Sequence, residues 1–389
     1  QSGWVQVKLR VLHVIPTLEQ GGAERVLANL VANSGDRLEH RVAQILDRPR
    51  FFPLEGAEVT CLGAKAPASL APAARRLRDL VRRVEPDVVQ GWLYHGNLLA
   101  SAAAGLRVPI LWSVHNTTLS WRSSSTIVNL SARIAAPLSG LVPRRILYCA
   151  ESARVLHERM GYARAKSVVI ENGISIGDYR YAGAQRRVFR AEAAIEDGDV
   201  VFGMLARYSP QKNHALVLEC VARVAARRKV RLLLAGKGCV PDNADLVGLL
   251  RSHGLEQQTL LLGERRDMQT LLSAMDVLVI GSSFGEALPM VAIEAAAASL
   301  PLVATRVGDV APFVLDPAHL VPPDDADAMV RALEGAAART DPAIRERPEL
   351  DHRWDRLQSY RIERMVDRYA ELYASVVEGS GVAASPADS

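Results

Sequence analysis

The sequence predicts an α/β protein made of two doubly wound, Rossmann-like domains, each with a parallel sheet. Three observations lead to this prediction. Short apolar runs rich in Val, Ile and Leu alternate with amphipathic helical stretches along the chain, which is typical of parallel sheets covered on both faces. The alternation stops at a glycine-broken segment, residues 171–185, and then restarts. The length of 389 residues is also enough for two domains of ordinary size.

The first half supplies most of the apolar runs. Residues 8–15, 40–46, 58–62, 87–92, 108–115 and 144–150 read as buried strands, because they are short and contain β-branched residues. Residues 24–34, 71–85 and 151–161 have the spacing of amphipathic helices. We therefore expect an N-terminal Rossmann-like domain over residues 1–178.

The second half repeats the pattern. Strands are expected at 200–206, 230–236, 259–263, 276–282 and 301–305, with helices that include 215–228 and 327–339. This predicts a second Rossmann-like domain over residues 186–358. A last helix, 359–378, carries an apolar stripe that includes Ile362, Val366 and Tyr369. Such a stripe needs a partner surface, and we expect it to pack on the N-terminal domain.

Composition excludes several classes of protein. The formal charge of +4 is mildly basic, which fits anionic small molecules or a membrane surface but is too weak to indicate nucleic acid. Four cysteines without metal-ligand spacing argue against structural zinc and disulfides, and favour a cytoplasmic location. The sequence contains no run of 18 apolar residues, so no membrane-spanning helix is expected.

Gly21 and Gly22 follow the first predicted strand and precede a helix. Backbone N–H groups at a helix N-terminus can bind a phosphate. A tight turn that needs glycine explains the pair equally well, and a full dinucleotide-binding fingerprint is absent.

Arg207 and Lys212 follow the first strand of the second domain, on the loop before a helix. Because ligands of doubly wound sheets bind at the carboxyl ends of the strands, this loop is expected to face a ligand. Two cations placed there could hold a diphosphate and neutralise it as it departs.

The stretch SSFGEALPMVAIEAAAAS, residues 282–299, carries two carboxylates among small apolar residues. Glu286 is expected in the loop and Glu294 about two turns into a helix that begins near Leu288 and Pro289. Carboxylates accept hydrogen bonds from sugar hydroxyls, including a ribose diol. Two acids on a solvated helix surface would fit poorly with so apolar a stretch.

Polar residues also end two strands of the first domain. His115 and Asn116 follow one strand, and Tyr94, His95 and Asn97 follow another. Together they favour a functional edge over purely structural roles. The arginine-rich helix at 71–85 could be a solvated face or could rest on anionic lipid.

Taken together, these motifs resemble the retaining family-4 glycosyltransferases of the GT-B fold. The resemblance covers nearly the whole chain and includes LHVIPTLEQGGAER, ARYSPQKN, LLGERRDM, GEALPMVAIEA and VATRVGDVA. The two glutamates eight positions apart are its most specific part. The stretch DVVQGWLYHGN is similar to a subgroup that acts in bacterial capsule, O-antigen or exopolysaccharide assembly.

The resemblance implies that the domain at 1–178 binds the acceptor and that the domain at 186–358 binds the nucleotide sugar. It also implies a role for individual residues. Arg207 and Lys212 match the pair that binds the donor diphosphate. Glu286 matches the acid that contacts the donor sugar, with Ala287 and Leu288 beside it, and Glu294 matches the acid that binds the ribose. His115 matches a histidine that lines the transferred sugar, and Gly21 and Gly22 match the phosphate loop. Tyr94, His95, Asn97 and Asn116 lie on the acceptor side. Ala287 and Ser299 stand where the family commonly has glycine.

The expected function is therefore retaining transfer of a sugar from a nucleoside diphosphate donor to a glycan or a polyprenyl-diphosphate-linked acceptor. A UDP-sugar is the favoured donor and GDP-mannose the second choice. No metal or other cofactor is implied, and the enzyme could sit peripherally on the inner face of the cell membrane. The alternatives are another GT-B enzyme, such as a nucleotide-sugar epimerase, and a non-catalytic nucleotide-sugar-binding module.

Overall fold

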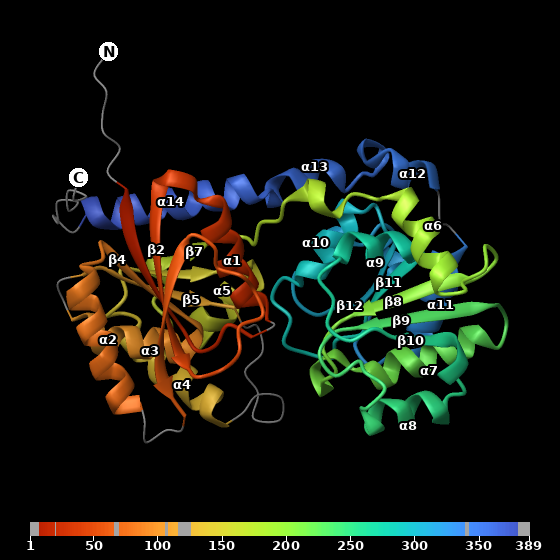
Figure 1. Ribbon diagram of the computed structural model, residues 1–389, viewed down its shortest axis with the longest axis horizontal. Helices are drawn as coiled ribbons and strands as arrows, with labels where there is room; N and C mark the ends of the chain where they lie inside the picture. Colours follow the sequence, from red (N-terminus) through yellow and green to blue (C-terminus); the bar gives the residue numbers. More distant parts are fainter. Residues whose placement is uncertain are drawn as a thin grey trace, which may run out of the picture. The chain divides into compact units, whose positions relative to one another are not determined.

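The computed structural model describes residues 8–19, 21–65, 70–105, 108–115, 126–338 and 342–379. The chain forms two compact units. Unit 1 comprises residues 1–173 together with 362–389, and unit 2 comprises residues 174–361. Each unit contains one parallel sheet flanked by helices, so the predicted fold class is confirmed (Figure 1).

The sheet of unit 1 has the strand order β3-β2-β1-β4-β5-β6-β7, and every pairing is parallel. Its strands are β1 (Leu9–Ile15), β2 (Leu38–Leu46), β3 (Ala57–Ala64), β4 (Val88–Trp92), β5 (Ile110–Val114), β6 (Arg145–Tyr148) and β7 (Ser167–Val169). The order reverses direction between β1 and β4. Ligands of doubly wound sheets bind at such a switch point.

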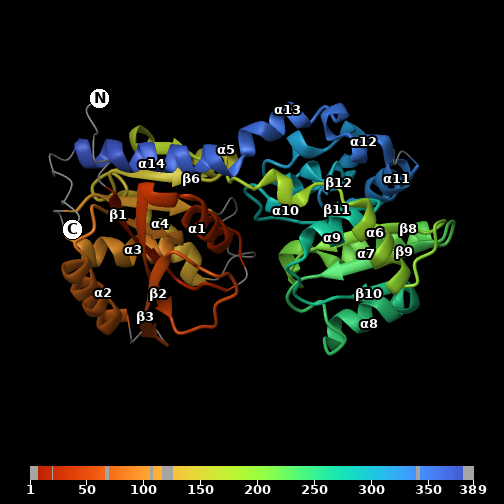
Figure 2. The same cartoon turned by 45° about the horizontal axis from the view of Figure 1, so that its top comes forward.

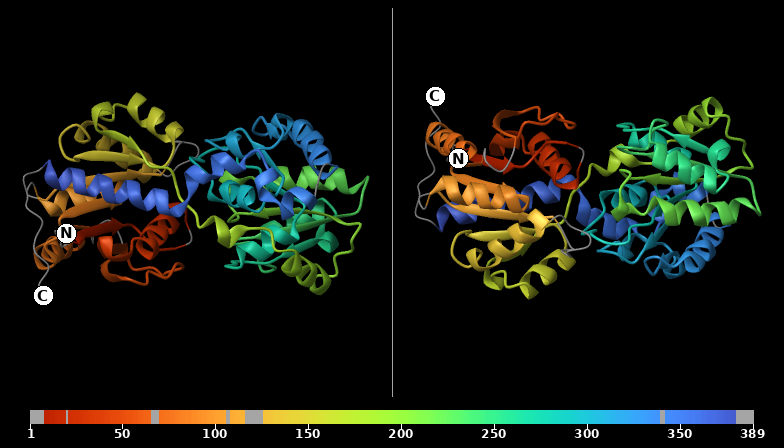
Figure 3. Two further views of the ribbon diagram at one scale, coloured as in Figure 1. Left: turned by 90° about the horizontal axis from the view of Figure 1, so that it is seen from above. Right: turned by 90° about the horizontal axis from the view of Figure 1, so that it is seen from below.

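Helices cover both faces of this sheet. They are α1 (Gly22–Asn33), α2 (Leu70–Val84), α3 (Leu93–Ala104), α4 (Thr126–Leu138), α5 (Glu151–Arg159) and α14 (Ile362–Glu378). α1 packs against α14 on one face, whereas α2, α3 and α4 pack beside one another on the other (Figure 3). The apolar side of α14 is buried, including Met365, Val366 and Tyr369, and the Tyr373 hydroxyl donates to Gln90 of β4. The last helix is therefore part of unit 1.

The sheet of unit 2 has the order β10-β9-β8-β11-β12-β13, again parallel throughout. Its strands are β8 (Val200–Leu205), β9 (Val230–Ala235), β10 (Thr259–Leu261), β11 (Val277–Ile280), β12 (Leu302–Thr305) and β13 (Leu320–Val321). The main helices are α6 (Gly183–Glu192), α7 (His214–Ala225), α8 (Ala244–Ser252), α9 (Met268–Ala274), α10 (Met290–Ala297), α11 (Ala326–Ala337), α12 (Pro342–Glu346) and α13 (Trp354–Leu357) (Figure 2). α7 and α11 pack together over a core of buried aliphatic side chains. The switch point lies between β8 and β11.

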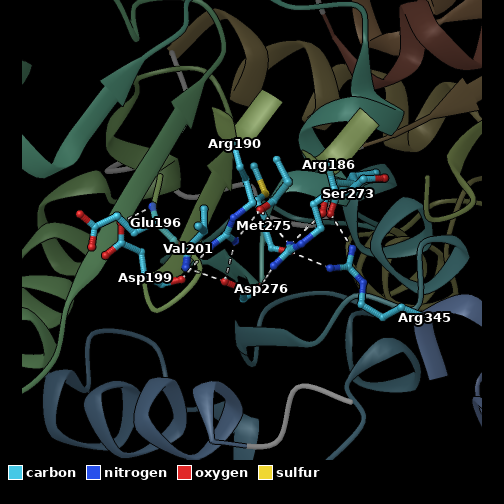
Figure 4. A network of polar contacts seen from close by, with 11 residues as sticks. Arg186, Arg190, Glu196, Asp199, Val201, Ser273, Met275, Asp276 and Arg345 are labelled. Atoms are coloured by element: carbon cyan, nitrogen blue, oxygen red, sulfur yellow. Dashed lines mark hydrogen bonds and ion pairs between the residues drawn. The ribbon is translucent and has the colours of Figure 1, made fainter. Parts of the chain in front are cut away.

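A polar network fixes the starts of β8 and β11 (Figure 4). The Asp276 carboxylate, just before β11, accepts from the backbone N–H of Val201 in β8 at 2.8 Å. Arg186 and Arg190 of α6 donate to the same carboxylate at 2.6 and 3.3 Å. Buried Arg345 adds hydrogen bonds to the carbonyls of Leu272 and Met275 at the end of α9. A buried charge is stable only when it is hydrogen-bonded, so the Asp276 carboxylate must keep its partners. This network therefore holds β8 and β11 in register.

Two short strands and part of the segment at 171–185 differ from the sequence-based expectation. β7 and β13, with three and two residues, lie outside the expected strands. Residues 176–179 form a 3₁₀ turn and α6 begins at Gly183, so much of the expected linker is helical and belongs to unit 2. In the part of the chain that the structure describes, no helix is both long and apolar enough to cross a bilayer.

Candidate active site

Two loops meet at the switch point of unit 2. Residues 206–213 follow β8 and lead into α7, and residues 281–289 follow β11 and lead into α10. The backbone N–H of Ser283 donates to the Gln211 carbonyl at 3.0 Å, which joins the two loops directly. Arg207, Lys212 and Glu286, which are expected to bind the donor, therefore lie at one edge of the sheet of unit 2.

Lys212 and Glu286 form an ion pair at this edge. Lys212 Nζ lies 2.5 Å from Glu286 Oε1, although the two residues are 74 positions apart. The hydroxyl of fully buried Ser282 donates to the same carboxylate oxygen at 2.6 Å. Glu286 is only 7 % exposed. Burial of this pair strengthens its attraction, and an ammonium group with three donors can hold Glu286 and still reach a second anion.

The neighbouring strand β12 and the loop after it hold the backbone around this ion pair. Thr305, the last residue of β12, donates its hydroxyl hydrogen to the Ser282 carbonyl at 2.6 Å. The backbone N–H of Asp309 donates to the Ala287 carbonyl at 2.8 Å. At Gly308, with φ of +68°, a Cβ would lie 2.4 Å from the Glu286 carbonyl oxygen. Only glycine fits there, so the loop after β12 fixes the backbone of Glu286 and Ala287.

Arg207 lies on the same loop as Lys212 but is exposed. One of its Nη2 hydrogens is donated to Gln211 Oε1 at 3.0 Å. The Gln211 amide lies against Gly285, where φ is +79° and a Cβ would come within 2.8 Å of Gln211 Nε2. Gly285 therefore makes room for the residue that orients Arg207. Gln211 and Ser282 were not expected at the site, although they lie within ARYSPQKN and SSFGEALPMVAIEAAAAS.

Glu294 lies in α10 and is completely buried. Pro289 is the N-cap of this helix, and Ala287 and Leu288 are each 6 % exposed in the turn before it. Ser299, where the resemblance leads one to expect glycine, has φ of +47° just after the helix. A left-handed backbone is the usual reason for glycine at such a position. The two acids are thus carried by different parts of one rigid turn and helix.

In unit 1, Gly21 and Gly22 lie where the sequence places them, after β1 and at the start of α1. Gly21 is the extended N-cap residue. The Glu24 carboxylate already occupies the space beside Gly21, because a Cβ there would fall 2.2 Å from Glu24 Oε2. The positive end of α1 is therefore partly compensated by the protein itself.

His115 follows β5 and is half-buried against Trp92, the last residue of β4. Their rings stack with centroids 5.4 Å apart and planes 16° apart. Burial lowers the pKa of His115 to about 4, so its imidazole is neutral at physiological pH. A neutral ring offers one donor and one acceptor to a sugar hydroxyl.

Trp92 is held in turn by two buried histidines. Its Nε1–H donates to His13 Nδ1 at 3.1 Å, which leaves the proton of His13 on Nε2. His13 Nε2 lies 2.9 Å from His40 Nδ1, and His40 Nε2 lies 2.9 Å from the Ser34 hydroxyl. Burial lowers the pKa of His13 and His40. This series of hydrogen bonds therefore has one consistent set of neutral tautomers. It fixes the Trp92 ring, against which His115 packs.

The structure corrects the roles expected for Tyr94 and Asn97. Both lie inside α3, which begins immediately after β4, and both are buried. The Asn97 side chain bonds the backbone N–H and the carbonyl of Ser113 in β5, each at 3.2 Å. The Tyr94 hydroxyl lies 2.6 Å from His157 Nε2 of α5. These side chains join elements of unit 1. His95 is half-buried in α3, and Asn116 lies outside the described residues.

His157 gives a testable dependence of stability on pH. Its Nδ1–H is bonded to the Ala153 carbonyl, and burial lowers its pKa to about 4. Between pH 4 and an ordinary unfolded value of about 6.5, the unfolded chain binds the extra proton, so stability falls as pH falls. We expect His157 to contribute a loss of about 2 kcal/mol between about pH 7 and about pH 5.

Urea unfolding at the two pH values measures this loss. The variant His157→Gln should show a smaller difference between the two pH values than wild type, whatever its stability at neutral pH. His352→Gln is the matched control, because His352 is exposed. An unchanged pH difference in His157→Gln would mean that other groups account for the acid sensitivity.

Within the ranges that the structure describes, no group of three or more His, Cys, Asp or Glu side chains is arranged to hold a metal ion. The four cysteines are free thiols, and Cys61 alone among them is exposed. Burial raises the pKa of the Cys239 thiol to about 11, so this thiol is protonated at neutral pH.

Comparison with known protein families gives two matches. A family profile described as "Glycosyltransferase Family 4" matches residues 20–177. A second, described as "Glycosyl transferases group 1", matches residues 199–338. The first match falls in unit 1 and the second in unit 2.

Individual proteins agree with these matches. EpsF of Bacillus subtilis (strain 168), a glycosyltransferase by provisional assignment, is 27 % identical over 316 residues, or 76 % of this chain and 78 % of that protein. An Escherichia coli enzyme, UDP-Gal:alpha-D-GlcNAc-diphosphoundecaprenol alpha-1,3-galactosyltransferase, is 24 % identical over 54 % of this chain and 55 % of its own length. The crystal structure of Anabaena HepE in complex with UDP-glucose superimposes with a TM-score of 0.80 at 18 % identity, covering 94 % of this chain and all of HepE. This last likeness shows the fold.

Proposed function

Because this chain belongs to the family-4 glycosyltransferases of the GT-B fold, we propose that it transfers a sugar, with retention at the anomeric carbon, from a nucleoside diphosphate donor to a hydroxyl of a lipid-linked or glycan acceptor. The observation that carries this proposal is the Lys212–Glu286 pair at the switch point of unit 2, with Arg207 on the same loop. Cations for a diphosphate and carboxylates for hydroxyls are what a nucleotide sugar requires.

The donor is proposed to lie along the loop after β8 and the start of α10. Arg207 and Lys212 bind the diphosphate, and Glu294 accepts hydrogen bonds from the ribose diol. Glu286, with Ala287 and Leu288, contacts the sugar to be transferred. A UDP-sugar is the first choice, which the UDP-glucose bound to HepE and the UDP-galactose in the name of the E. coli relative support. GDP-mannose is the second.

The proposed chemistry needs no side-chain nucleophile. The bond between the anomeric carbon and the diphosphate oxygen breaks, and the acceptor oxygen bonds to the same face of the sugar. The acceptor proton passes to the departing diphosphate oxygen. Arg207 and Lys212 stabilise the negative charge that develops there, a contribution that removal of one such group typically reveals as about 10²–10³ in kcat. The cations take the place of a metal, so activity is proposed to be metal-independent.

The acceptor is proposed to be a polyprenyl-diphosphate-linked glycan in bacterial polysaccharide assembly, on the cytoplasmic face of the membrane. Support comes from the diphosphoundecaprenol acceptor in the name of the E. coli relative. In unit 1, Gly21 and Gly22 are proposed to approach the donor phosphates. His115 is proposed to contact the transferred sugar, since its neutral ring can both donate and accept.

A nucleotide-binding experiment tests the proposal. Thermal unfolding is measured with UDP, GDP and ADP, each with and without EDTA. A ligand at 100 times its Kd stabilises by about 2.7 kcal/mol, so the correct diphosphate should raise the Tm clearly. Release of free diphosphate from the matching donor sugar then separates an enzyme from a binding protein.

The matched variants are Arg207→Ala with Lys212→Ala, and Arg251→Ala as a control at an exposed position of α8. The double variant should lose the shift in Tm, and the control should keep it. A shift that survives in the double variant would place the diphosphate elsewhere, and a shift abolished by EDTA would contradict metal independence.

A further inference from the structure

A third loop of unit 2 reaches the two loops that carry the Lys212–Glu286 pair. It is the turn at residues 322–325, between β13 and α11. Since β8, β11, β12 and β13 follow one another in a parallel sheet, the loops after these strands lie at the same edge. Asp324 of the turn is hydrogen-bonded to Asn213, 111 positions away, and to Ser283, 41 positions away. Asn213 ends the first loop of the candidate site and Ser283 lies in the second.

Asp324, Asn213 and Ser283 form a closed ring of hydrogen bonds, which we name the 213–283–324 cluster. Asn213 Nδ2 donates to Ser283 Oγ at 2.9 Å and to Asp324 Oδ1 at 2.8 Å. The Ser283 hydroxyl donates to the same Asp324 oxygen at 2.8 Å. Both amide hydrogens and the hydroxyl hydrogen are thus used within the cluster. Asp324 Oδ1 is the shared acceptor, so its removal would leave both of the other side chains without a partner for one hydrogen.

The cluster fixes the backbone beside each member of the ion pair. Asn213 directly follows Lys212, and its Oδ1 accepts from the backbone N–H of Leu216 at 3.2 Å, which caps α7. Its backbone is left-handed, with φ of +51°. Ser283 lies three residues before Glu286 in the loop after β11. The Lys212 ammonium and the Glu286 carboxylate are therefore carried by two segments that Asp324 joins.

The backbone of Asp324 indicates that its side chain has a specific use. Its φ is +59°, in the left-handed region that favours glycine. The next residue, Asp325, already caps α11 by accepting from the backbone N–H of Ala328 at 2.9 Å. The start of α11 therefore does not require the Asp324 carboxylate. Unfavourable backbone conformations persist where the surrounding contacts require them, and they concentrate at functional sites.

We propose that Asp324 is a positioning residue of the active site, which acts through Asn213 and Ser283 to hold Lys212 and Glu286 in the geometry needed for transfer. The inference rests on the proposed function, in which Lys212 stabilises the departing diphosphate. A cation stabilises developing charge best when it is fixed in place before the reaction. Loosening the two loops should therefore lower kcat more than it raises KM for the donor.

Steady-state kinetics of Asp324→Gly, with the donor varied, test the proposal. Glycine suits the left-handed backbone, so this variant removes the carboxylate without adding strain. Its urea unfolding midpoint should stay near that of wild type, while kcat falls about ten-fold or more because the reacting groups are less well placed. Asp324→Asn keeps an acceptor oxygen and should restore most of the activity.

Asp327→Asn is the matched control. Asp327 also lies on α11 and also bonds α7, through Arg223 Nη2 at 2.6 Å, but its side chain is 71 % exposed. It should keep the kinetic constants of wild type. An unchanged kcat in Asp324→Gly, or an equal loss of kcat in Asp327→Asn, would overturn the positioning role.

A double-mutant cycle with Lys212→Met tests the route of the effect. Asp324→Gly should lower kcat much less in the Lys212→Met background than in wild type, because the group on which it acts is already absent. The same cycle is measured by urea unfolding without a donor. Lys212→Met should destabilise Asp324→Gly less than it destabilises wild type. Equal effects in both backgrounds, in kcat and in unfolding, would mean that Asp324 does not act through the ion pair.

The same measurements separate failure of this inference from failure of the proposed function. If Lys212→Met lowers kcat and Asp324→Gly does not, only the positioning role is wrong. If wild type transfers no sugar, or if Lys212→Met leaves kcat unchanged, the proposed function is wrong. The unfolding cycle then still decides whether Asp324 holds the Lys212–Glu286 pair, because it needs neither donor nor acceptor.

Discussion

Replacing Lys212 with methionine is expected to lower kcat by about 10²–10³-fold, the usual loss when one group that stabilises transition-state charge is removed. Two effects combine in this variant. The departing diphosphate loses a cation, and the buried Glu286 carboxylate loses the ammonium group 2.5 Å away. Steady-state kinetics with the donor varied measure the first effect. Urea unfolding measures the second, expected at about 3 kcal/mol for breaking a buried pair by removing one partner.

The double variant Lys212→Met/Glu286→Gln isolates the effect on stability, because Glu286→Gln is itself expected to lower kcat. It removes both charges, so stability should return toward that of wild type while kcat stays low. Lys229→Met is the control, because Lys229 also pairs with a glutamate, Glu196, at 3.0 Å, but both side chains are about 70 % exposed. An exposed pair contributes at most about 1 kcal/mol. If the double variant recovered activity together with stability, neither Lys212 nor Glu286 would act in the transfer step.

The fold was predictable where the apolar pattern is long. Residues 8–15 and 200–206 read as buried strands, and β1 and β8 lie there. The strands β7 and β13, which were not expected from the sequence, add only three and two residues to the edges of their sheets. A strand of that length is defined by its pairing with β6 or β12, which is a tertiary contact and not a local property of the sequence.

The location of the candidate site could be predicted from the parallel topology of the sheet. Arg207, Lys212 and Glu286 follow strands, and the carboxyl ends of parallel strands meet at one edge. The direction of each side chain could not be predicted in this way. The pairing of Lys212 with Glu286 depends on β8 lying next to β11, which sequence order alone leaves open. Tyr94 and Asn97 also follow a strand, but α3 begins at once, and its first turns direct both into the interior.

Buried histidines show the same limit. A single sequence does not reveal that His13 and His40, 27 positions apart, are hydrogen-bonded to each other inside a sheet. Their neighbours His115 and Trp92 could be placed at strand ends from the sequence, but the ring stacking could not. The sequence thus predicts which edge is functional, whereas packing decides which polar side chains are used there.

The two carboxylates, Glu286 and Glu294, should respond differently to the same substitution. Under the proposed function, Glu294 binds the ribose, which does not react. Glu294→Gln should therefore weaken ground-state and transition-state binding alike, and raise KM for the donor with little change in kcat. Glu286 contacts the sugar whose charge changes during transfer, and its Oε1 is already held by Ser282 and Lys212. Glu286→Gln should mainly lower kcat.

Each loss should be about 1–3 kcal/mol, the usual cost of removing a hydrogen bond to a charged group, or roughly 5- to 150-fold in the affected constant. The measurement is steady-state kinetics at saturating acceptor with the donor varied, alongside Glu219→Gln on the exposed face of α7 as the control. If Glu294→Gln lowered kcat and Glu286→Gln raised KM instead, the roles assigned to the two glutamates would be exchanged. Wild-type values of kcat and KM in both variants would show that the donor does not bind to this turn and helix. Gln is a suitable substitution because it has nearly the same size as Glu and should not disturb α10.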